Sequence, residues 1–234
     1  MPTDPKIAKV IIPALNEQES ISKVIKELPK KWISEIIVVD NGSVDKTASI
    51  ARSHGATVLS EPQRGYGKAC LKGLHYIKNQ QTRTDIVIFI DADYSDYPAD
   101  IEKIITPILK QNYDFVLGAR VKHLQEKGAM TLPQRFGNLL ATFLMHHLYN
   151  SKFTDLGPLR AIKYDKLISL GMQDTTYGWT IEMQLKALKH KLKYLEIPVR
   201  YKKRIGTSKI SGTIKGVIMA GYKILSWIFK YRKG

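Results

Sequence analysis

Short runs of Ile and Val recur through the first half of the chain, and each leads into a segment whose apolar residues have helical spacing. Strands that alternate with helices in this way pair in parallel, through right-handed crossovers. The pattern therefore predicts an α/β fold, a single Rossmann-like domain with a mostly parallel central sheet flanked by helices. The expected strands are 9–13, 35–40, 56–59, 86–90 and 115–119, and the expected helices are 20–28, a segment through Ala48 and Ala51, 67–77, and 98–109.

The alternation changes from about residue 130. An apolar helix is expected at 136–149, a second helix at 180–188, and a strand at 193–201 that Pro198 interrupts, as at the edge of a sheet or in a mixed arrangement. A chain of 234 residues is long enough for one domain with a full core, and no internal repeat requires a second domain.

The cysteine content and the N-terminal residues indicate the cellular compartment in which the protein is expected. Cys70 is the only cysteine, which excludes an internal disulfide and leaves a cysteine-based zinc site unsupported. The first residues lack the charged and apolar regions of a signal peptide, and no uninterrupted apolar stretch reaches the length of a membrane span. We therefore expect a cytoplasmic protein.

The C-terminal region is strongly basic. The formal net charge is +16, and no acidic residue follows Glu196. This charge suggests an anionic partner, which could be a phosphorylated substrate, an anionic membrane or nucleic acid. If 213–233 forms one helix, its lysines fall within an arc of roughly 80°. Such a basic amphipathic helix can make a peripheral contact with the cytoplasmic face of a membrane, or it can pack on the domain core.

Two aspartates stand where the expected strand 86–90 ends, in Asp91-Ala92-Asp93. In open α/β sheets, ligands bind beyond the carboxyl ends of the strands. Aspartate oxygens are hard ligands suited to Mg²⁺ or Mn²⁺, and such a cation can bridge the oxygens of a nucleotide diphosphate. Taken alone, Asp-x-Asp is more simply explained as a solvated turn, so the neighbouring segments decide whether it is read as a metal site.

Other segments are expected at the same edge of the sheet. The first strand leads into 13–17 and the second into 40–45, so carboxylates from both would stand beside the aspartate pair. Acidic side chains there can accept hydrogen bonds from a base or a ribose, although helix capping or a turn would also explain Asp40. After the third strand, glycines permit close backbone approach, while Arg64 and Lys68 can face phosphate at a helix N-terminus.

Together these segments resemble the family 2 glycosyltransferases with the GT-A fold, and within them the dolichol-phosphate mannose or glucose synthase-like branch. The resemblance covers nearly the whole chain. It implies one GT-A domain at 1–212, with a donor half at about 1–120 and an acceptor half at about 121–212, followed by a basic amphipathic helix at 213–234. The matching segments are 13–17, 39–47, 64–69, 91–98, 117–120, 154–160 and 197–209.

The resemblance also implies roles at the donor site. Asp91 and Asp93 would hold Mg²⁺ or Mn²⁺ on the donor diphosphate, and Glu17 and Asp40 would bind the nucleoside. Arg204 would lie with Lys209 on a loop that closes over the donor. The donor-site residues expected in full are Pro13, Asn16, Glu17, Asp40, Gly42, Arg64, Gly65, Lys68, Asp91, Ala92, Arg204 and Lys209.

The predicted reaction is an inverting displacement that moves a hexose from a nucleotide-sugar of the UDP-glucose or GDP-mannose type to a polyprenyl or dolichyl phosphate. Arg120 and Arg135 match arginines that grip this acceptor phosphate, and Arg160 suits the same role. A phosphate monoester is largely ionised at neutral pH, because its second pKa is about 6, so it needs no strong base. The alternative is a hydroxyl acceptor, which would need a carboxylate base. Asp155 and Glu182 are the candidates, although capping would explain Glu182 nearly as well.

The chain departs from the branch at two places. Mannose synthases usually have Gln two residues after the second aspartate as a further metal ligand, where this chain has Ser95. The family often has Asp-x-x-Ser-Gly-Phe where this chain has 155–160, so sugar specificity is not carried over. A basic nucleic-acid-binding protein is the alternative from a different class, and it is suggested by charge alone. We expect no nucleic-acid partner, and the sequence leaves the oligomeric state open.

Overall fold

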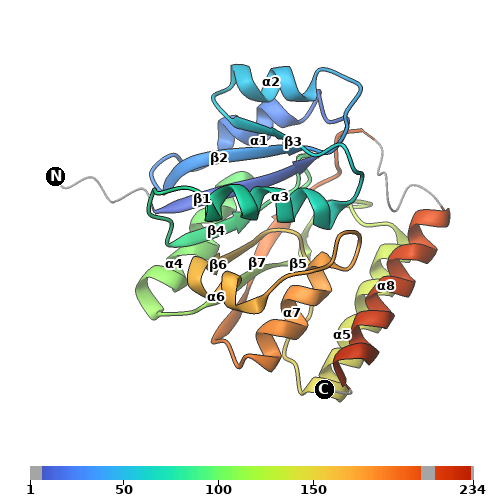
Figure 1. Cartoon of the computed structure of the whole chain (residues 1–234). Helices are drawn as coiled ribbons and strands as arrows, with labels where there is room; N and C mark the ends of the chain where they lie inside the picture. The colour runs from blue at the N-terminus through green and yellow to red at the C-terminus, as the bar shows by residue number, and fades with distance from the viewer. Residues whose placement is uncertain (1–6, 207–213, 233–234) are drawn as a thin grey trace.

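The computed structural model describes residues 7–206 and 214–232, which contain one seven-stranded sheet with helices on both faces (Figure 1). The strand order is β3-β2-β1-β4-β6-β5-β7, and within the sheet β6 alone runs antiparallel to its neighbours. This arrangement confirms the predicted α/β fold with a mostly parallel central sheet. The strands are β1 (Ala8–Ala14), β2 (Ile33–Asp40), β3 (Thr57–Ser60), β4 (Ile86–Phe89), β5 (Phe115–Gln125), β6 (Arg160–Lys163) and β7 (Tyr194–Tyr201).

The central strands are buried because their side chains are apolar on both faces. On β1, Ile11 belongs to one apolar core, whereas Val10 and Ile12, which point the opposite way, belong to the other. Side chains from α3, α6 and α7 complete the first core, and those from α1, α2 and α4 complete the second. These helices are α1 (Ile21–Glu27), α2 (Thr47–Ser53), α3 (Tyr66–Lys78), α4 (Ile101–Gln111), α6 (Tyr164–Leu170) and α7 (Trp179–Lys189), with a 3₁₀ turn at Pro98–Asp100 before α4.

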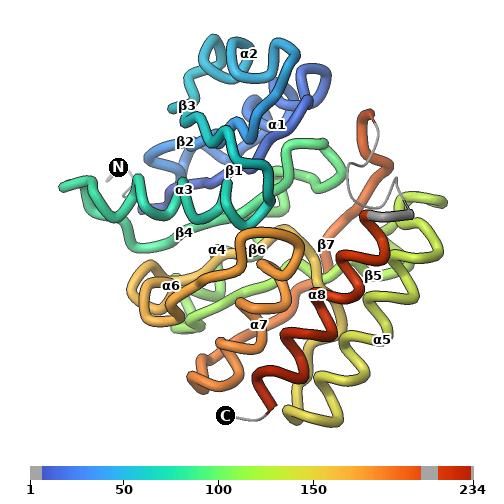
Figure 2. The backbone as a smooth tube through the Cα atoms, turned by 45° about the vertical axis from the view of Figure 1, so that its right-hand side comes forward, coloured from blue at the N-terminus to red at the C-terminus, as the bar shows by residue number. Residues whose placement is uncertain are grey.

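Two long helices, α5 (Leu132–Tyr149) and α8 (Ile214–Arg232), lie side by side at one end of the molecule (Figures 1 and 2). The inner side of α8 contributes Trp227 and Ile228 to the first core, next to α7. Among the helices that the structure describes, none has both the length and the apolarity needed to cross a bilayer.

Two elements of the second half were not predicted. Strand β6 has only four residues, too few for a clear alternation, and α6 follows it directly. The strand lies between β4 and β5, so these two parallel strands are not neighbours. Helix α5 also begins earlier than the expected position 136, because Thr131 and Gln134 form a capping box in which the Thr131 N–H donates to Gln134 Oε1 at 2.8 Å.

Candidate active site

Two cavities meet at the carboxyl ends of β1, β2 and β4. The smaller has a volume of about 300 Å³ and is lined by residues that follow these strands. The larger has a volume of about 750 Å³ and extends between α5 and α8. They form one cleft, with a small end that holds the aspartates and a long end between the helices, because five residues line both: Tyr66, Asp91, Asp93, Tyr177 and Arg204.

Asp91 and Asp93 face this cleft from the loop after β4. The Tyr66 hydroxyl donates to Asp91 Oδ1 at 3.0 Å. Burial, together with the negative charge of Asp93, raises the pKa of Asp91 to about 7. The backbone N–H and the hydroxyl of Ser95 both donate to Asp93 Oδ1, at 2.9 and 2.6 Å. Ser95 is fully buried, so it orients Asp93 instead of reaching into the cleft.

The two carboxylates fit a small divalent cation. Their mutual repulsion contributes to the raised pKa of Asp91, and a bound cation would relieve it. Within residues 7–206 and 214–232, no group of three or more His, Cys, Asp or Glu could hold a metal ion. Asp91 and Asp93 would therefore share Mg²⁺ or Mn²⁺ with diphosphate oxygens and water, which is a coordination that Mg²⁺ commonly adopts.

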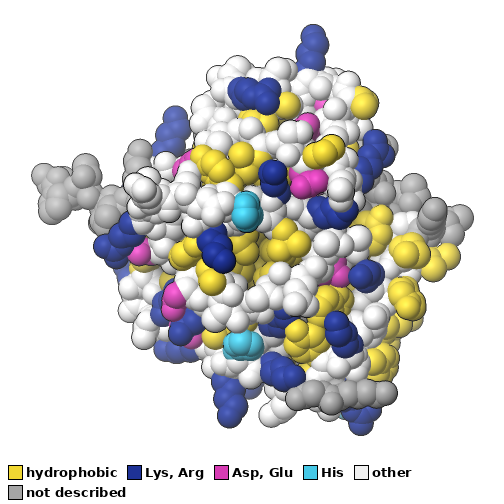
Figure 3. Space-filling view, in the orientation of Figure 1, with side chains coloured by type: hydrophobic (Ala, Val, Ile, Leu, Met, Phe, Trp, Pro, Cys, Tyr) yellow, Lys and Arg dark blue, Asp and Glu magenta, His cyan; other side chains and the backbone are white. Residues whose placement is uncertain are grey.

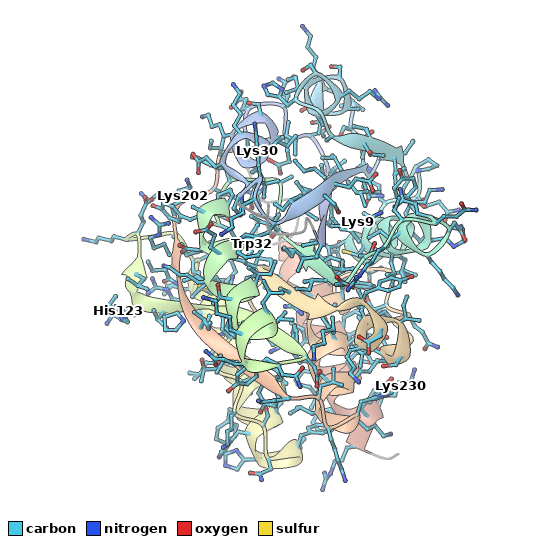
Figure 4. The ribbon with its side chains drawn as sticks, turned by 90° about the vertical axis from the view of Figure 1, so that its left-hand side faces the viewer. Lys9, Lys30, Trp32, His123, Lys202 and Lys230 are labelled. Carbon is cyan, nitrogen blue, oxygen red and sulfur yellow. The ribbon has the colours of Figure 1, made fainter. Side chains whose placement is uncertain are left out.

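Arg204 connects the carboxylates of Glu17 and Asp93 across the cleft. Its guanidinium lies 2.8 Å from Glu17 Oε1 and 3.2 Å from Asp93 Oδ2. The segment that carries it is tied to the aspartate loop, because the N–H of Ile205 donates to the Asp93 carbonyl and that of Lys202 to the Ser95 carbonyl, both at 2.9 Å. Figure 4 marks Lys202, which follows β7. The expected partner of Arg204 on this loop, Lys209, lies outside the described residues.

The residues expected at the donor site fall into two groups. Asn16 and Asp40 accept backbone N–H groups of the turn 41–44, at 2.9 and 3.3 Å, and Gly42 has the positive φ of 81° that this turn requires. These three residues shape the turn and are not among the described residues that line the smaller cavity. The expected residues that do line it are Pro13, Glu17, Arg64, Gly65, Asp91, Ala92 and Arg204.

The N–H groups at the N-terminus of α3, which were expected to face phosphate, are hydrogen-bonded within the protein. The N–H groups of Gly67 and Lys68 donate to carbonyls of the loop 173–178, at 3.1 and 3.0 Å. A Cβ on Gly67 would lie 1.9 Å from the Asp174 carbonyl oxygen, so the glycine allows two chain segments to touch. The Lys68 ammonium bonds the side chain of Gln63. The phosphate contact expected of Lys68 therefore stays a prediction that rests on its side chain and not on the N–H groups of the helix end.

Arg120 lines the long end of the cleft, where Asp155 holds it. Its Nε and Nη2 donate to the two carboxylate oxygens at 2.8 Å each. Burial opposes the charged form, but the Asp155 carboxylate outweighs it and raises the pKa of Arg120. Asp155 is itself 3% exposed, so it orients Arg120 and is not available as the general base that a hydroxyl acceptor would need.

Three other predicted side chains are turned away from the cleft. Arg135 is exposed on α5 and is not among the residues lining either cavity. Glu182 is fully buried, where it accepts two N–H groups of the loop 173–178 at 2.8 and 2.7 Å and lies 2.7 Å from Lys186 Nζ. Arg160 is also buried, donates to the Thr180 carbonyl at 3.0 Å, and has a pKa lowered by burial to about 10. Burial thus removes Arg160 from the acceptor and Glu182 from the role of a base, whereas the role expected of Arg135 stays a prediction.

Four residues of the site were not singled out from the sequence. The Asn41 side chain joins the end of β2 to the glycine loop, because its Oδ1 accepts the Gly65 N–H at 2.7 Å. Tyr66 supports Asp91, and its position beside Gly65 was the only signal for it. Thr176 and Tyr177 line the smaller cavity from a loop that no motif marks.

The α/β fold and the paired aspartates at the carboxyl edge of its sheet agree with what the resemblance to GT-A glycosyltransferases implied. The sequence profile described as glycosyl transferase family 2 matches residues 9–171, and the chain belongs to this family.

Named relatives cover nearly the whole chain. An uncharacterized glycosyltransferase of Mycobacterium tuberculosis (strain H37Rv) is 32% identical, over 90% of this chain and 93% of its own. A protein named UDP-N-acetylglucosamine–dolichyl-phosphate N-acetylglucosaminyltransferase, from Methanococcus voltae, is 29% identical, over 98% of this chain and 97% of its own.

A solved structure shares the fold. Glucosyl-3-phosphoglycerate synthase from Mycobacterium tuberculosis, in complex with Mn²⁺, UDP and glucosyl-3-phosphoglycerate, superposes with a TM-score of 0.77. It is 21% identical, and the match covers 97% of this chain and 80% of that one. At this identity the likeness establishes the fold alone.

Proposed function

We propose that this protein transfers a hexose from a nucleotide-sugar, of the UDP-glucose or GDP-mannose type, to a polyprenyl phosphate in an inverting reaction that depends on Mg²⁺ or Mn²⁺. The observation that carries the choice of acceptor is the long end of the cleft, which leads from between α5 and α8 to Arg120 and the aspartates. The relative from Methanococcus voltae, whose name specifies a dolichyl phosphate, supports the same choice.

The donor would occupy the small end of the cleft. Glu17 there can accept hydrogen bonds from a ribose, and Arg64 can pair with phosphate oxygens. A cation held by Asp91 and Asp93 would offset the charge that develops on the leaving diphosphate. Arg204 pairs with Glu17 and Asp93, so a donor that engages these carboxylates frees its guanidinium to contact the diphosphate.

The acceptor phosphate would bind at Arg120. Asp155 engages the Nε and Nη2 edge of the guanidinium, which leaves the Nη1 amino group directed away from that carboxylate. A guanidinium fixed in this way can orient the acceptor phosphate and reduce its repulsion from the donor diphosphate. The prenyl chain would extend along apolar side chains from both long helices and from the segments just before and after α5. These are Met130, Pro133, Phe136, Leu140, Leu156, Val217, Ile224 and Leu225.

The carboxylates that could act as a base are held in ion pairs, which favours a phosphate acceptor over a hydroxyl acceptor. The two carboxylates proposed as bases, Asp155 and Glu182, are buried in ion pairs with Arg120 and Lys186. An alcohol would need a carboxylate base within hydrogen-bond reach, a role for which these two are not free, whereas a phosphate dianion attacks without a base. This argument supports the phosphate acceptor independently of the apolar lining.

Helices α5 and α8 also carry exposed apolar side chains on their outer surface, which Figure 3 shows toward its lower right. On α5 they recur at helical spacing, and Leu132 is 79% exposed. The sequence has no Asp or Glu between 127 and 154 or after 196, so this surface lacks the charges that would repel anionic lipid. The apolar face of α5 and α8, as we call it, comprises Leu132, Phe136, Leu139, Phe143, Ile218, Met219, Tyr222 and Phe229.

We propose that this face meets the cytoplasmic surface of a membrane, where a polyprenyl phosphate would be found. The contact differs from the basic stripe that the sequence suggested on the C-terminal helix. Lys223 lies 3.3 Å from the buried Asp174 and so faces the domain, whereas Lys230 is exposed (Figure 4). The side chains of Lys215 and Lys233 lie outside the described part of the chain. Apolar contact from two helices would therefore contribute more to membrane binding than a lysine stripe.

A transfer assay with matched acceptors tests the proposed function. The protein is incubated with MnCl₂, a panel of radiolabelled UDP- and GDP-hexoses, and either polyprenyl phosphate or the corresponding polyprenol, and label is counted in the organic phase. We expect transfer to polyprenyl phosphate only, abolished by Asp93→Asn and by chelation, and unchanged in Leu109→Ser on α4. Transfer to polyprenol, or only to water-soluble acceptors such as 3-phosphoglycerate, would refute the proposed acceptor.

A further inference from the structure

The loop 173–178, between α6 and α7, forms one wall of the small end of the cleft. Thr176 and Tyr177 line the smaller cavity, and Tyr177 lines the larger one as well. The position of this loop therefore sets the shape of the cavity in which the donor is proposed to bind.

Asp174 organises the loop from inside the protein, where it is 2% exposed. Its Oδ1 accepts the backbone N–H groups of Thr176 and Gly178, at 2.7 and 2.9 Å, which closes the loop on itself. Its Oδ2 accepts the indole N–H of Trp227 at 2.7 Å and lies 3.3 Å from Lys223 Nζ. Trp227 and Lys223 belong to α8, so a single carboxylate joins the C-terminal helix to the wall of the cleft.

The charge on this carboxylate is maintained at neutral pH. Burial alone would raise the pKa of Asp174, but the hydrogen bonds from Trp227 and the loop, together with Lys223, hold it below its usual range. Hydrogen bonds to a charged acceptor are about twice as strong as neutral ones, so the connection to α8 resists separation.

The loop has little room to move independently of α8. A Cβ on Gly178 would lie 2.4 Å from the Trp227 indole nitrogen and 2.5 Å from an Asp174 carboxylate oxygen. On the other side, carbonyls of the loop accept the first N–H groups of α3, and a Cβ on Gly65 would lie 2.2 Å from the Thr175 carbonyl oxygen. Contacts this close transmit a displacement of α8 to the cavity wall.

We propose that Asp174, Trp227 and Lys223 are positioning residues of the donor site, which makes α8 a structural part of that site. Neither Trp227 nor Lys223 is among the described residues that line the smaller cavity, so both act through Asp174 and the loop. The inference rests on the proposed function in one respect, that a nucleotide binds at the small end. Donor affinity then depends on how α8 is seated, and α8 is the helix proposed to meet the membrane.

The test is nucleotide binding without acceptor or membrane. The dissociation constants of UDP and GDP are measured by calorimetry in MnCl₂ for the wild-type protein, Trp227→Phe and Lys223→Ala. Trp227→Phe keeps an aromatic ring in the core but removes the indole N–H and part of the ring, so Lys223→Ala, which leaves the core unchanged, is measured beside it. We expect the affinity for the preferred nucleotide to fall about five-fold or more, which is the lower end of typical coupling between sites. Hydrogen exchange at Thr176 and Tyr177 should become faster in the same variants.

Ser226→Ala and Arg232→Ala are the matched controls, because both residues are exposed on α8. They should bind the nucleotide as the wild type does, and Lys223→Arg should restore most of what Lys223→Ala loses. In the transfer assay, Trp227→Phe should raise the KM of the donor more than the KM of the acceptor, which a general loss of stability would not do.

The outcomes separate the two proposals. Wild-type affinity in both Trp227→Phe and Lys223→Ala would overturn the positioning role and leave the proposed function standing. If the wild-type protein binds neither nucleotide, the proposed function fails and this inference fails with it. If circular dichroism shows that Trp227→Phe does not fold, Lys223→Ala decides the question, because that side chain is 35% exposed and its loss leaves the core intact.

Discussion

Arg120 and Asp155 form a two-pronged ion pair at the inner end of the long part of the cleft, with Nε–Oδ2 and Nη2–Oδ1 distances of 2.8 Å. The backbone N–H of Arg120 adds a third hydrogen bond to the same carboxylate at 2.9 Å. Both side chains are nearly buried, at 10% and 5% exposed. The plane of the guanidinium is therefore fixed before an acceptor arrives, which reduces the ordering that binding requires.

Replacing Asp155 with Asn should impair acceptor use and leave donor binding intact. Breaking a buried ion pair typically destabilises a protein by about 3–5 kcal/mol, so the melting temperature should fall. A misplaced guanidinium should lower kcat/KM for the acceptor about 100-fold. Arg120→Lys keeps the positive charge but lacks the planar guanidinium, so it should also lower kcat/KM for the acceptor. Steady-state kinetics with varied acceptor concentration measure the loss of acceptor use. Calorimetry with UDP or GDP measures whether donor binding is intact. Normal acceptor kinetics in Asp155→Asn would contradict the role given to Arg120.

Removing the Ser95 hydroxyl should weaken metal binding. Ser95→Ala deletes the donor that lies 2.6 Å from Asp93 Oδ1. Loss of a group that orients a metal ligand commonly lowers metal affinity 10- to 100-fold, and we expect about tenfold for Mn²⁺, measured by electron paramagnetic resonance. Ser95→Gln should not restore the affinity, because the position is fully buried. Tighter Mn²⁺ binding in Ser95→Gln would show instead that this position supplies a ligand.

The sheet, and which segments meet at the small end of the cleft, could be predicted because both depend on local patterns. Runs such as Ile86–Phe89 are apolar throughout, which identifies a strand buried on both faces. The carboxyl ends of parallel strands share an edge, so Glu17 after β1 and Asp91 after β4 could be placed together without coordinates.

The acceptor end could not be predicted in the same way, because there the role of a residue depends on its partners. Asp155 has the chemistry of a base, but Arg120, 35 positions away, occupies its carboxylate. The contact between Trp227 and Asp174 spans 53 positions. No spacing rule relates such pairs, since they meet only after the sheet has formed. The short antiparallel strand β6, which sets the distance between β4 and β5, was missed for a related reason, as its four residues pair with strands far along the chain.

Metal binding should weaken as the pH falls through about 7. Burial and the charge of Asp93 raise the pKa of Asp91 to about 7 in the metal-free protein, so a cation must displace a proton at lower pH. The dissociation constant of Mn²⁺ should change little above about pH 8 and rise by up to about tenfold per pH unit below 7. Titration calorimetry across this range provides the measurement. Asp91→Asn should bind weakly at every pH, and a pH dependence that survives in this variant would assign the proton to another group.

The same pKa shift predicts how stability depends on pH without metal. A carboxyl whose pKa is raised by folding, here from 3.8 to about 7, holds its proton more tightly in the folded state. Its contribution to stability is therefore complete below about pH 4 and is lost as the pH rises through 7. Asp91→Asn cannot ionise, so its melting temperature should exceed that of the wild type by a margin that grows between pH 4 and 7. Equal margins at pH 5 and pH 8, measured in chelator, would contradict this assignment.

Exposed phenylalanines on α5 should determine membrane binding. Phe136 and Phe143 are 69% and 55% exposed, and burial of such a side chain contributes about 1.5–3 kcal/mol. Phe143→Ser should therefore lower the partition coefficient onto phosphatidylglycerol vesicles about tenfold or more, measured by co-sedimentation. Leu109→Ser is the control, because Leu109 is an exposed apolar residue on α4, away from α5 and α8 (Figure 1). Equal partitioning of both variants and the wild type would show that the apolar face of α5 and α8 meets something other than lipid. Activity with a short, water-soluble prenyl phosphate should survive Phe143→Ser, because Phe143 does not line the described cavities.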